Sequence, residues 1–256
     1  MAEDPAGGRR RRLVTRDDDG GGPAAADGNG SGAADESAAA DPRRLRRIRR
    51  GYDAWARVYD WFARATASVG GVREACVRGL DLAPGDTVVE FGCGPGVNLP
   101  ALRDAVGRNG RVVGVDVSPQ MLDRAAGLVE RRGWENVSLV EADAERPPVA
   151  AADGVLATFV TSLFADPYRV VSRWCDLADA VVLAAFVPEG NRAANAALRA
   201  FVRLNGRLFD ARSDDPLGTL RERTAAARRA LDDRAAVRER ERRVFGTIAV
   251  EAGRER

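Results

Sequence analysis

Five short apolar runs alternate with helical patterns through the middle of this sequence, and this alternation constrains the fold more than any other feature. The runs are TVVEF (87–91), RVVGVDV (111–117), VSLVEAD (137–143), GVLATFV (154–160) and AVVLAAFV (180–187). Strands separated by helices pair in parallel, because the chain needs a crossover to return to the same edge of a sheet. The pattern therefore predicts a doubly wound sheet with helices on both of its faces.

Helical patterns fill the intervals between these runs and continue beyond them. We expect helices over residues 71–80 and 97–106, a third that begins near Ser118-Pro119, and an Arg-rich helical stretch from about 192 to 232. Serine followed by proline is a favourable pair for a helix cap and first turn. Residues 236–242 and 245–252 indicate a terminal antiparallel pair. The predicted fold class is α/β: a Rossmann-like, mostly parallel seven-stranded sheet with an antiparallel C-terminal strand.

The N-terminal part differs in composition from the rest. Residues 1–41 are mainly Gly, Ala, Asp and Arg, which cannot bury enough apolar surface to offset the entropy of ordering. We expect a disordered tail there and one domain over residues 42–256. The first helical segment of that domain is interrupted at Gly51 and has one continuous apolar face, formed by Leu45, Ile48, Tyr52, Trp55, Tyr59 and Phe62.

Two residue types are missing from the chain. There is no histidine, and all 40 basic side chains are arginine because lysine is also absent. This excludes an imidazole base, a Ser-His-Asp triad, a Schiff-base lysine and a P-loop lysine. The three cysteines, Cys76, Cys93 and Cys175, are widely spaced, which fits reduced thiols and predicts no metal site. The sequence shows no apolar run of about 18 residues and no secretory signal, so we expect a cytoplasmic protein.

The net charge is small and unevenly distributed. Residues 51–256 hold 29 arginines and 29 acidic residues, whereas residues 1–50 hold 11 arginines and 9 acidic residues. A neutral body argues against nucleic acid as a partner. The six arginines from Arg43 to Arg50 are either a solvated helix face or, beside Leu45, Ile48 and Trp55, an interfacial anchor. Residues 43–62 are therefore a candidate for peripheral membrane contact.

A glycine-rich loop directly follows the first predicted strand. It reads E-F-G-C-G-P-G from Glu90 to Gly96, and its glycines allow the backbone to turn tightly and approach a ligand. The spacing G-x-G-x-G differs from the G-x-G-x-x-G of dinucleotide-binding folds. Asp116 ends the second strand and Asp143 ends the third, so both acids are expected beside the same crevice, where a carboxylate accepts hydrogen bonds from ribose hydroxyls.

The motifs VVEFGCGPG, GVDVSPQML and EADAERPP occur in the order and spacing of class I S-adenosylmethionine-dependent methyltransferases, which the chain resembles from about residue 45 onward. The resemblance implies S-adenosyl-L-methionine as the cofactor. It also implies roles for individual residues: Glu90, Gly92, Gly94 and Gly96 around the methionine part, Asp116 on the ribose, Val117 or Met121 against the adenine, Asp143 and Ala144 on the adenine edge, and Phe159 and Val160 at the methyl-transfer site. Cys93 lies within the same loop, where a small packing residue and a reactive thiol are the two interpretations.

The opening segment has a counterpart in the same family. Y-D-x-x-A-x-x-Y-D, from Tyr52 to Asp60, resembles the N-terminal helix of the subgroup that includes quinone-biosynthesis and phosphatidylethanolamine methyltransferases. The resemblance implies that residues 42–80 form lid helices and that Tyr59 faces the cofactor. The alternative is that Tyr52 and Tyr59 are core contacts of an amphipathic helix.

Two departures concern the acceptor. The chain reads CDLADAVVL where the family has a Pro-Gly-Gly turn, and residues 191–234 form a helical insertion in the region that shapes substrate choice. The resemblance implies methyl transfer to a small-molecule, lipid or quinone-type acceptor. The alternatives are an RNA or protein methyltransferase anchored by the basic segment, and a non-catalytic cofactor-binding scaffold. A hydroxyl or carbon acceptor requires a base, for which Tyr59, Asp60 and Asp166 are the candidates, and the oligomeric state stays open.

Overall fold

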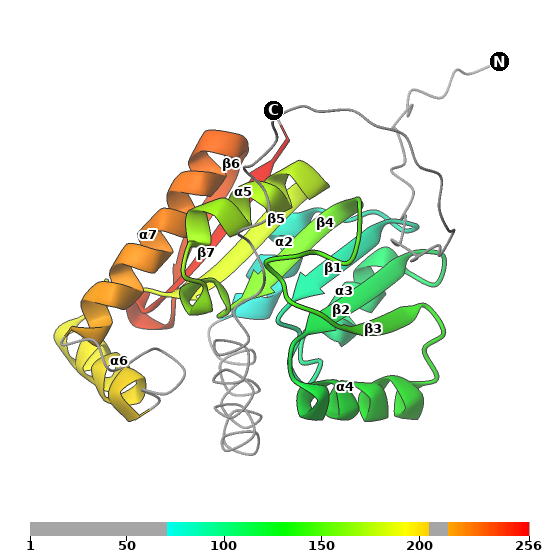
Figure 1. Ribbon diagram of the computed structural model, residues 1–256, viewed down its shortest axis with the longest axis horizontal. Coiled ribbons are helices and arrows are strands. Elements are labelled where there is room, and N and C mark those ends of the chain that lie inside the picture. The colour runs from blue at the N-terminus through cyan, green and yellow to red at the C-terminus, as the bar shows by residue number, and fades with distance from the viewer. Residues whose placement is uncertain (1–70, 205–214, 256) are drawn as a thin grey trace, which may run out of the picture.

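The computed structural model describes residues 71–204 and 215–255, which form one seven-stranded sheet in the order β3-β2-β1-β4-β5-β7-β6 (Figure 1). The strands are β1 (Thr87–Phe91), β2 (Arg111–Asp116), β3 (Val137–Glu141), β4 (Ala152–Thr158), β5 (Ala178–Phe186), β6 (Ala236–Arg243) and β7 (Ile248–Arg254). Strands β1 to β5 pair in parallel, and β7 runs antiparallel to both β5 and β6. The predicted fold class is confirmed.

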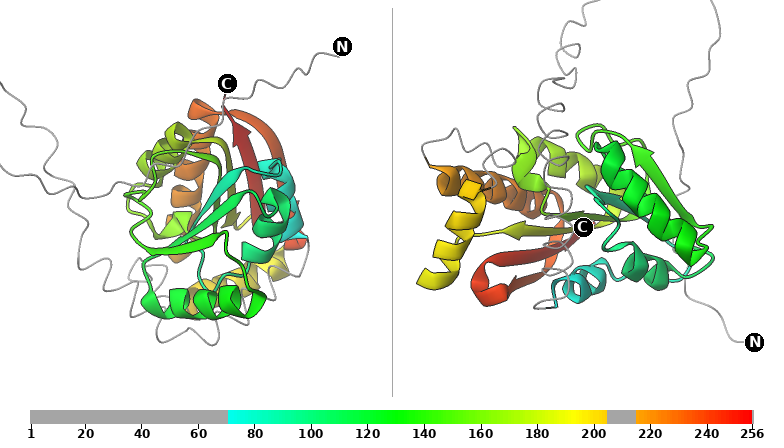
Figure 2. Two further views of the ribbon diagram at one scale, coloured as in Figure 1. Left: turned by 90° about the vertical axis from the view of Figure 1, so that its right-hand side faces the viewer. Right: turned by 90° about the horizontal axis from the view of Figure 1, so that it is seen from below.

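Helices cover both faces of this sheet. They are α2 (Val72–Leu80), α3 (Leu99–Val106), α4 (Pro119–Arg132), α5 (Pro167–Leu177), α6 (Arg192–Leu204) and α7 (Pro216–Arg234). Helices α2 and α3 contact each other on one face, while α5 and α7 contact each other on the opposite face (Figure 2). Helix α4 packs on β2 and β3 at one end of the sheet, and α6 lies at the other end (Figure 1).

The centre of the sheet is fully enclosed because helices shield both of its sides. Val88, Val89 and Phe91 of β1 have no exposed surface. The ring of Phe91 stacks on Trp174 of α5 with centroids 4.9 Å apart. Continuous apolar strands of this kind are typical of parallel sheets buried on both faces.

The helix ends follow from local side-chain chemistry. Ser118 caps α4 by accepting a hydrogen bond from the backbone N–H of Met121, and the helix ends at Gly133, whose φ of 61° suits glycine. Asp166 and Asp215 cap α5 and α7 in the same way, through the N–H groups of Arg169 and Gly218. The predicted start of a helix at Ser118-Pro119 is confirmed.

Several predicted boundaries were wrong by a few residues. The third strand ends at Glu141 instead of Asp143, because its partner β2 ends at Asp116 and the two residues are paired in register. The fourth strand ends at Thr158 instead of Val160, since Phe159 has a φ of 60° and leaves the extended conformation. The last strand begins only at Ile248, after a turn that contains residues 244–246.

Other predictions lie outside the described residues. These are the disordered tail over residues 1–41, the break at Gly51, and the segment 43–62 with Tyr52, Tyr59 and Asp60. The lid helices predicted over residues 42–80 are described only from residue 71. Within residues 71–204 and 215–255, no helix combines the length and the apolar character needed to cross a membrane.

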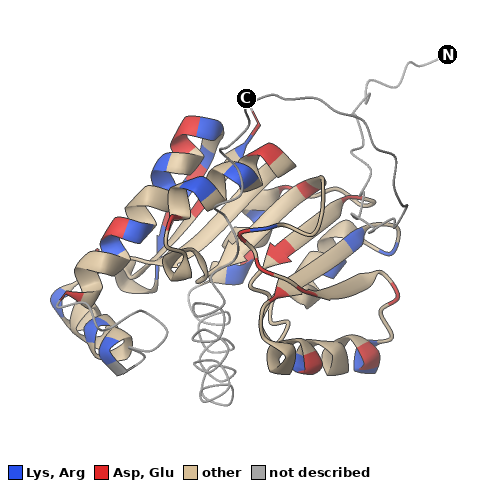
Figure 3. Cartoon of the chain, in the orientation of Figure 1, with Lys and Arg blue, Asp and Glu red and all other residues tan. Residues whose placement is uncertain are grey.

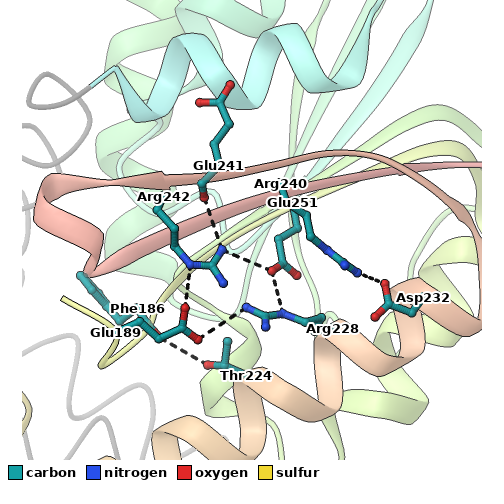
Figure 4. Close-up of polar contacts among 9 residues, drawn as sticks. All are labelled: Phe186, Glu189, Thr224, Arg228, Asp232, Arg240, Glu241, Arg242 and Glu251. Atoms are coloured by element: carbon teal, nitrogen blue, oxygen red, sulfur yellow. Dashed lines mark hydrogen bonds and ion pairs between the residues drawn. The ribbon is translucent and has the colours of Figure 1, made fainter.

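A buried carboxylate ties the C-terminal hairpin to α7 (Figure 4). Glu251 of β7 lies 2.7 Å from Nε of Arg228 on α7 and 3.7 Å from a terminal nitrogen of Arg242 on β6. The Arg228 contact has the distance of an ion pair, although its N–H does not meet the angular criterion of a hydrogen bond. Glu189, which follows β5, pairs with the same two arginines at 3.8 and 2.8 Å. This network positions the β6–β7 turn against the segment that leads into α6.

Candidate functional site

The glycine loop begins where β1 ends, at the carboxyl edge of the parallel strands. Gly92, Gly94 and Gly96 have φ values of 71°, 54° and 83°, all in the left-handed region that favours glycine. The N–H groups of Gly92 and Cys93 donate to the carbonyl of Val115 at 2.8 and 3.1 Å. The loop is therefore held against β2 and leads into α3.

The glycines of this loop serve different purposes. A Cβ at Gly92 would lie 3.1 Å from Val160, across the end of β4. A Cβ at Gly96 would lie 2.8 Å from Leu99 and 3.3 Å from Ala125. Gly92 thus allows Val160 to approach the loop closely, whereas Gly96 allows close packing of the loop on α3 and α4.

Two recesses meet at Gly92, and the first contains Asp116. Its carboxylate is only 6% exposed. One oxygen accepts from the N–H of Gly94 at 2.9 Å and the other from the N–H of Ser118 at 2.9 Å. Burial raises the pKa of Asp116, and these backbone hydrogen bonds oppose that rise. The recess is lined by Gly92, Val115, Asp116, Val117, Ala142, Asp143, Ala144, Val160, Leu163 and Phe164.

The second recess lies on the other side of the loop and is organised by Asn98. Its side-chain amide donates to Glu90 Oε1 at 2.6 Å and to Thr158 Oγ1 at 3.2 Å. Within the described residues, the backbone N–H groups of Val97 and Asn98 donate to no protein acceptor. The recess is lined by Val72, Arg73, Cys76, Gly92, Cys93, Gly94, Pro95, Val97, Asn98, Thr158 and Phe159.

Arg73 is a site residue that the sequence did not predict. It lies in the first turn of α2 and lines the second recess. Its Nε is buried, and among the described residues it has no hydrogen-bond partner. Burial raises the pKa of Glu90, and the charge of Arg73 opposes that rise, so the two side chains interact electrostatically. No local motif distinguishes Arg73 from the other arginines of the chain, and only the packing of α2 beside the loop brings it there.

Phe159 projects from the end of β4 in a constrained conformation. Its φ of 60° is unusual for a residue with a side chain and costs about 1–2 kcal/mol relative to the right-handed region. The backbone is held there because its N–H donates to the carbonyl of Ala184 at 2.7 Å. Its ring stacks on Phe186 with centroids 4.5 Å apart. Strain of this kind is often found at functional sites.

The structure does not bring Met121 or Asp166 to the recesses, whereas Cys93 lines the second one. Met121, in the first turn of α4, is fully buried in the core. Asp166 is exposed and caps α5, where its carboxylate accepts a hydrogen bond from the N–H of Arg169. The sulfur of Cys93 would lie 3.0 Å from a Cβ at Gly114, and burial raises the pKa of this thiol. These features favour packing over reactivity for Cys93.

The raised pKa of the Glu90 carboxyl has an effect on stability that can be measured. The side chain is 1% exposed, and burial raises its pKa from 4.5 to about 8. Between these two values the folded protein holds a proton on Glu90 that the unfolded chain has released, so the contribution of Glu90 to stability is greatest below pH 4.5 and falls as the pH rises toward 8. We expect denaturant unfolding of wild type to show this decline. Glu90→Gln, which mimics the protonated form, should lack it, and parallel pH curves for the two proteins would contradict the assignment.

The residues of the two recesses fit S-adenosyl-L-methionine. Asp116 presents buried oxygens to a ribose diol, with apolar side chains and Asp143 beside it for the adenine. The second recess offers Arg73 and the free amides at the start of α3 to a carboxylate. Arg73 Nε is buried there without a partner among the described residues, and a carboxylate would satisfy it.

Comparison with known proteins agrees with this geometry. Residues 88–178 match the family model described as "Methyltransferase domain". Aklanonic acid methyltransferase DauC of Streptomyces sp. (strain C5) is 33% identical over 97 residues, which cover 37% of this chain and 44% of that protein. Phosphatidylethanolamine N-methyltransferase of Cereibacter sphaeroides is 36% identical over 130 residues, which cover 49% of this chain and 60% of that protein. The chain thus spans about half the length of these relatives.

A solved structure shows the same fold. The crystal structure of a SAM-dependent methyltransferase from Aquifex aeolicus superposes with a TM-score of 0.55 at 18% identity and covers 74% of this chain and 92% of the other. At this level of identity the similarity concerns the arrangement of strands and helices.

Proposed function

We propose that the class I S-adenosylmethionine-dependent methyltransferase domain of this chain transfers a methyl group to a small-molecule or lipid acceptor. The observation that carries the proposal is the pair of recesses on either side of Gly92, with Asp116 in one and Arg73 in the other. When bound, the cofactor supplies a methyl group already activated by its sulfonium. The protein's task is then to bind, orient and exclude water, which suits a chain without histidine or lysine.

Each recess has a distinct role in this proposal. Asp116 accepts hydrogen bonds from the ribose hydroxyls, while Val117 and Ala144 enclose the adenine and Asp143 contacts its edge. Arg73 pairs with the carboxylate of the methionine part, on the other side of Gly92. Glu90 stays beneath the loop and orients Asn98, which is the first residue before α3.

The acceptor side is apolar and aromatic. Phe159 borders the second recess and stacks on Phe186, and Phe186 in turn contacts Phe201 of α6 at a centroid distance of 5.5 Å. The three rings form a continuous path from the reaction site to α6. Besides Arg73, Asn98 and Thr158, this recess is lined by apolar side chains, among them Val72, Val97 and Phe159, which form an apolar wall. Such a wall favours an acceptor with a substantial apolar part over a nucleic acid or a charged peptide.

Methyl transfer can be tested with cofactor carrying a labelled methyl group. The full chain is incubated with a lipid extract, an aqueous metabolite extract, total RNA or a protein extract from the same cells. We expect label in the lipid or small-molecule fraction. Label confined to RNA or protein would contradict the proposed acceptor class. Cofactor binding without transfer to any fraction would favour a non-catalytic scaffold.

A further inference from the structure

The end of the molecule that carries α6 has a basic surface. Arg192, Arg199 and Arg203 follow one another at spacings of seven and four, so they lie on one side of the helix, and all three are exposed. Helix α6 contains no acidic residue, and within the described residues none of these arginines has an ion pair. Figure 3 shows basic positions along α6. Asp215 shares a recess with Arg199 and Arg203, and its carboxylate caps α7 through the N–H of Gly218.

A phenylalanine projects from the hairpin turn beside the same helix. Phe245 is 79% exposed and is one of two exposed large apolar side chains in the described part of the chain. The turn packs on Gly190, because a Cβ there would lie 2.8 Å from the carbonyl oxygen of Phe245. Gly190 precedes Arg192 by two residues, so the turn and the start of α6 are neighbours (Figure 2).

The conformation of this turn makes the phenylalanine more unusual. Thr247 N–H donates to the carbonyl of Val244 at 3.1 Å, and the two central residues, Phe245 and Gly246, have φ values of 54° and 85°. These are the signs of a type I′ turn, whose first central position strongly prefers asparagine. Val244 also has a positive φ, of 47°. Phenylalanine is therefore unfavourable at this position for two reasons: its backbone has a positive φ, and its apolar ring is exposed to solvent. No contact within the described residues accounts for it.

We propose that the surface formed by the α6 arginines and Phe245 docks on an anionic lipid bilayer. Arginines attract the surface charge of anionic lipids, and an exposed aromatic ring beside them enters the interfacial layer. The Phe201–Phe186–Phe159 path starts at the opposite, inward side of α6 and ends at the second recess. Docking would place that path next to the membrane. We therefore infer that the methyl acceptor is a molecule that resides in the bilayer. This last step rests on the proposed methyl transfer, whereas the docking itself does not.

Vesicle co-sedimentation of the full chain tests the docking. The probes are phosphatidylcholine vesicles with and without about one third phosphatidylglycerol. We expect binding to the anionic vesicles only, weakened by salt. The triple variant Arg192→Gln, Arg199→Gln, Arg203→Gln should bind on the order of 100-fold more weakly, because each basic residue near such a surface contributes about fivefold. A matched triple variant of exposed arginines elsewhere, Arg108→Gln, Arg111→Gln, Arg131→Gln, should bind as wild type does.

Phe245→Asn gives an independent test, because a loss of vesicle binding in this variant could not be explained by unfolding. Asparagine suits the turn, so the midpoint of thermal unfolding should stay the same or rise, while vesicle binding falls about tenfold through loss of the buried ring. The proposal would be overturned if the Arg192, Arg199, Arg203 triple variant bound anionic vesicles as tightly as wild type does. A preference of the wild-type protein for a duplex RNA oligonucleotide over anionic vesicles would also overturn it. Cofactor binding is measured on the same proteins. If wild type fails to bind cofactor, the proposed methyl transfer fails, and the vesicle result still decides the docking.

Discussion

Asp116→Ala is expected to weaken binding of S-adenosylmethionine by roughly two orders of magnitude, measured by equilibrium titration. Two hydrogen bonds from ribose hydroxyls to a carboxylate contribute together roughly 3 kcal/mol, which corresponds to about 100-fold. The Asp116 carboxylate also accepts hydrogen bonds from the backbone N–H groups of Gly94 and Ser118. Its removal leaves both amides without their acceptor, so the glycine loop is held to the end of β2 only through the carbonyl of Val115.

Asp123→Ala is the matched control for this experiment. Asp123 is exposed on α4, and its removal changes the net charge by the same amount without touching either recess. We expect wild-type affinity for this variant. If Asp116→Ala bound the cofactor as tightly as wild type, Asp116 would not contact the ribose and the assignment of the first recess would be wrong.

Gly92→Ala is expected to reduce cofactor affinity at least tenfold and to destabilise the fold by about 1–2 kcal/mol. The φ of 71° at this position is unfavourable for alanine, and the added Cβ would lie 3.1 Å from Val160. Val160 is β-branched and buried, so the loop has to move instead. Because Gly92 lines both recesses, such a movement changes the adenosine side and the methionine side together.

Gly133→Ala separates the two contributions to this effect. Gly133 has a similar φ of 61°, but an added Cβ would meet nothing within 4 Å. It should lose only the conformational part, about 1 kcal/mol in chemical denaturation, and bind the cofactor normally. Similar cofactor affinities for the Gly92 and Gly133 variants would show that the contact with Val160 has no role in the site.

The strand pattern predicted the sheet because each central strand is buried on both faces. Val88, Val89 and Phe91 are all apolar for this reason, and such runs can be recognised without a partner. The ends of strands are harder to predict. Asp143 was expected to close the third strand, yet β3 stops at Glu141 because β2 stops opposite it at Asp116. That limit is set by the neighbouring strand and is invisible in the sequence of β3 itself.

The site residues divide in the same way. Glu90, Gly92 and Asp116 were predicted because they lie at the ends of strands with the spacing of a known motif. Met121 was predicted with them, but it lies on the buried side of α4, in the core. Periodicity cannot distinguish a helix residue that faces a ligand from one that faces the sheet, since both are buried.

The amino-acid sequence by itself determined the α/β architecture, the glycine loop and the carboxylate at the end of the second strand. These depend on short-range patterns: apolar runs, turn residues and strand-to-helix junctions. Only the tertiary structure placed Arg73 beside Glu90, joined Phe159 to Phe186 and Phe201, and set the turn at Phe245 against Gly190, just before α6. Those contacts join residues far apart in the chain. They arise when helices pack on the sheet, so no local pattern could specify them.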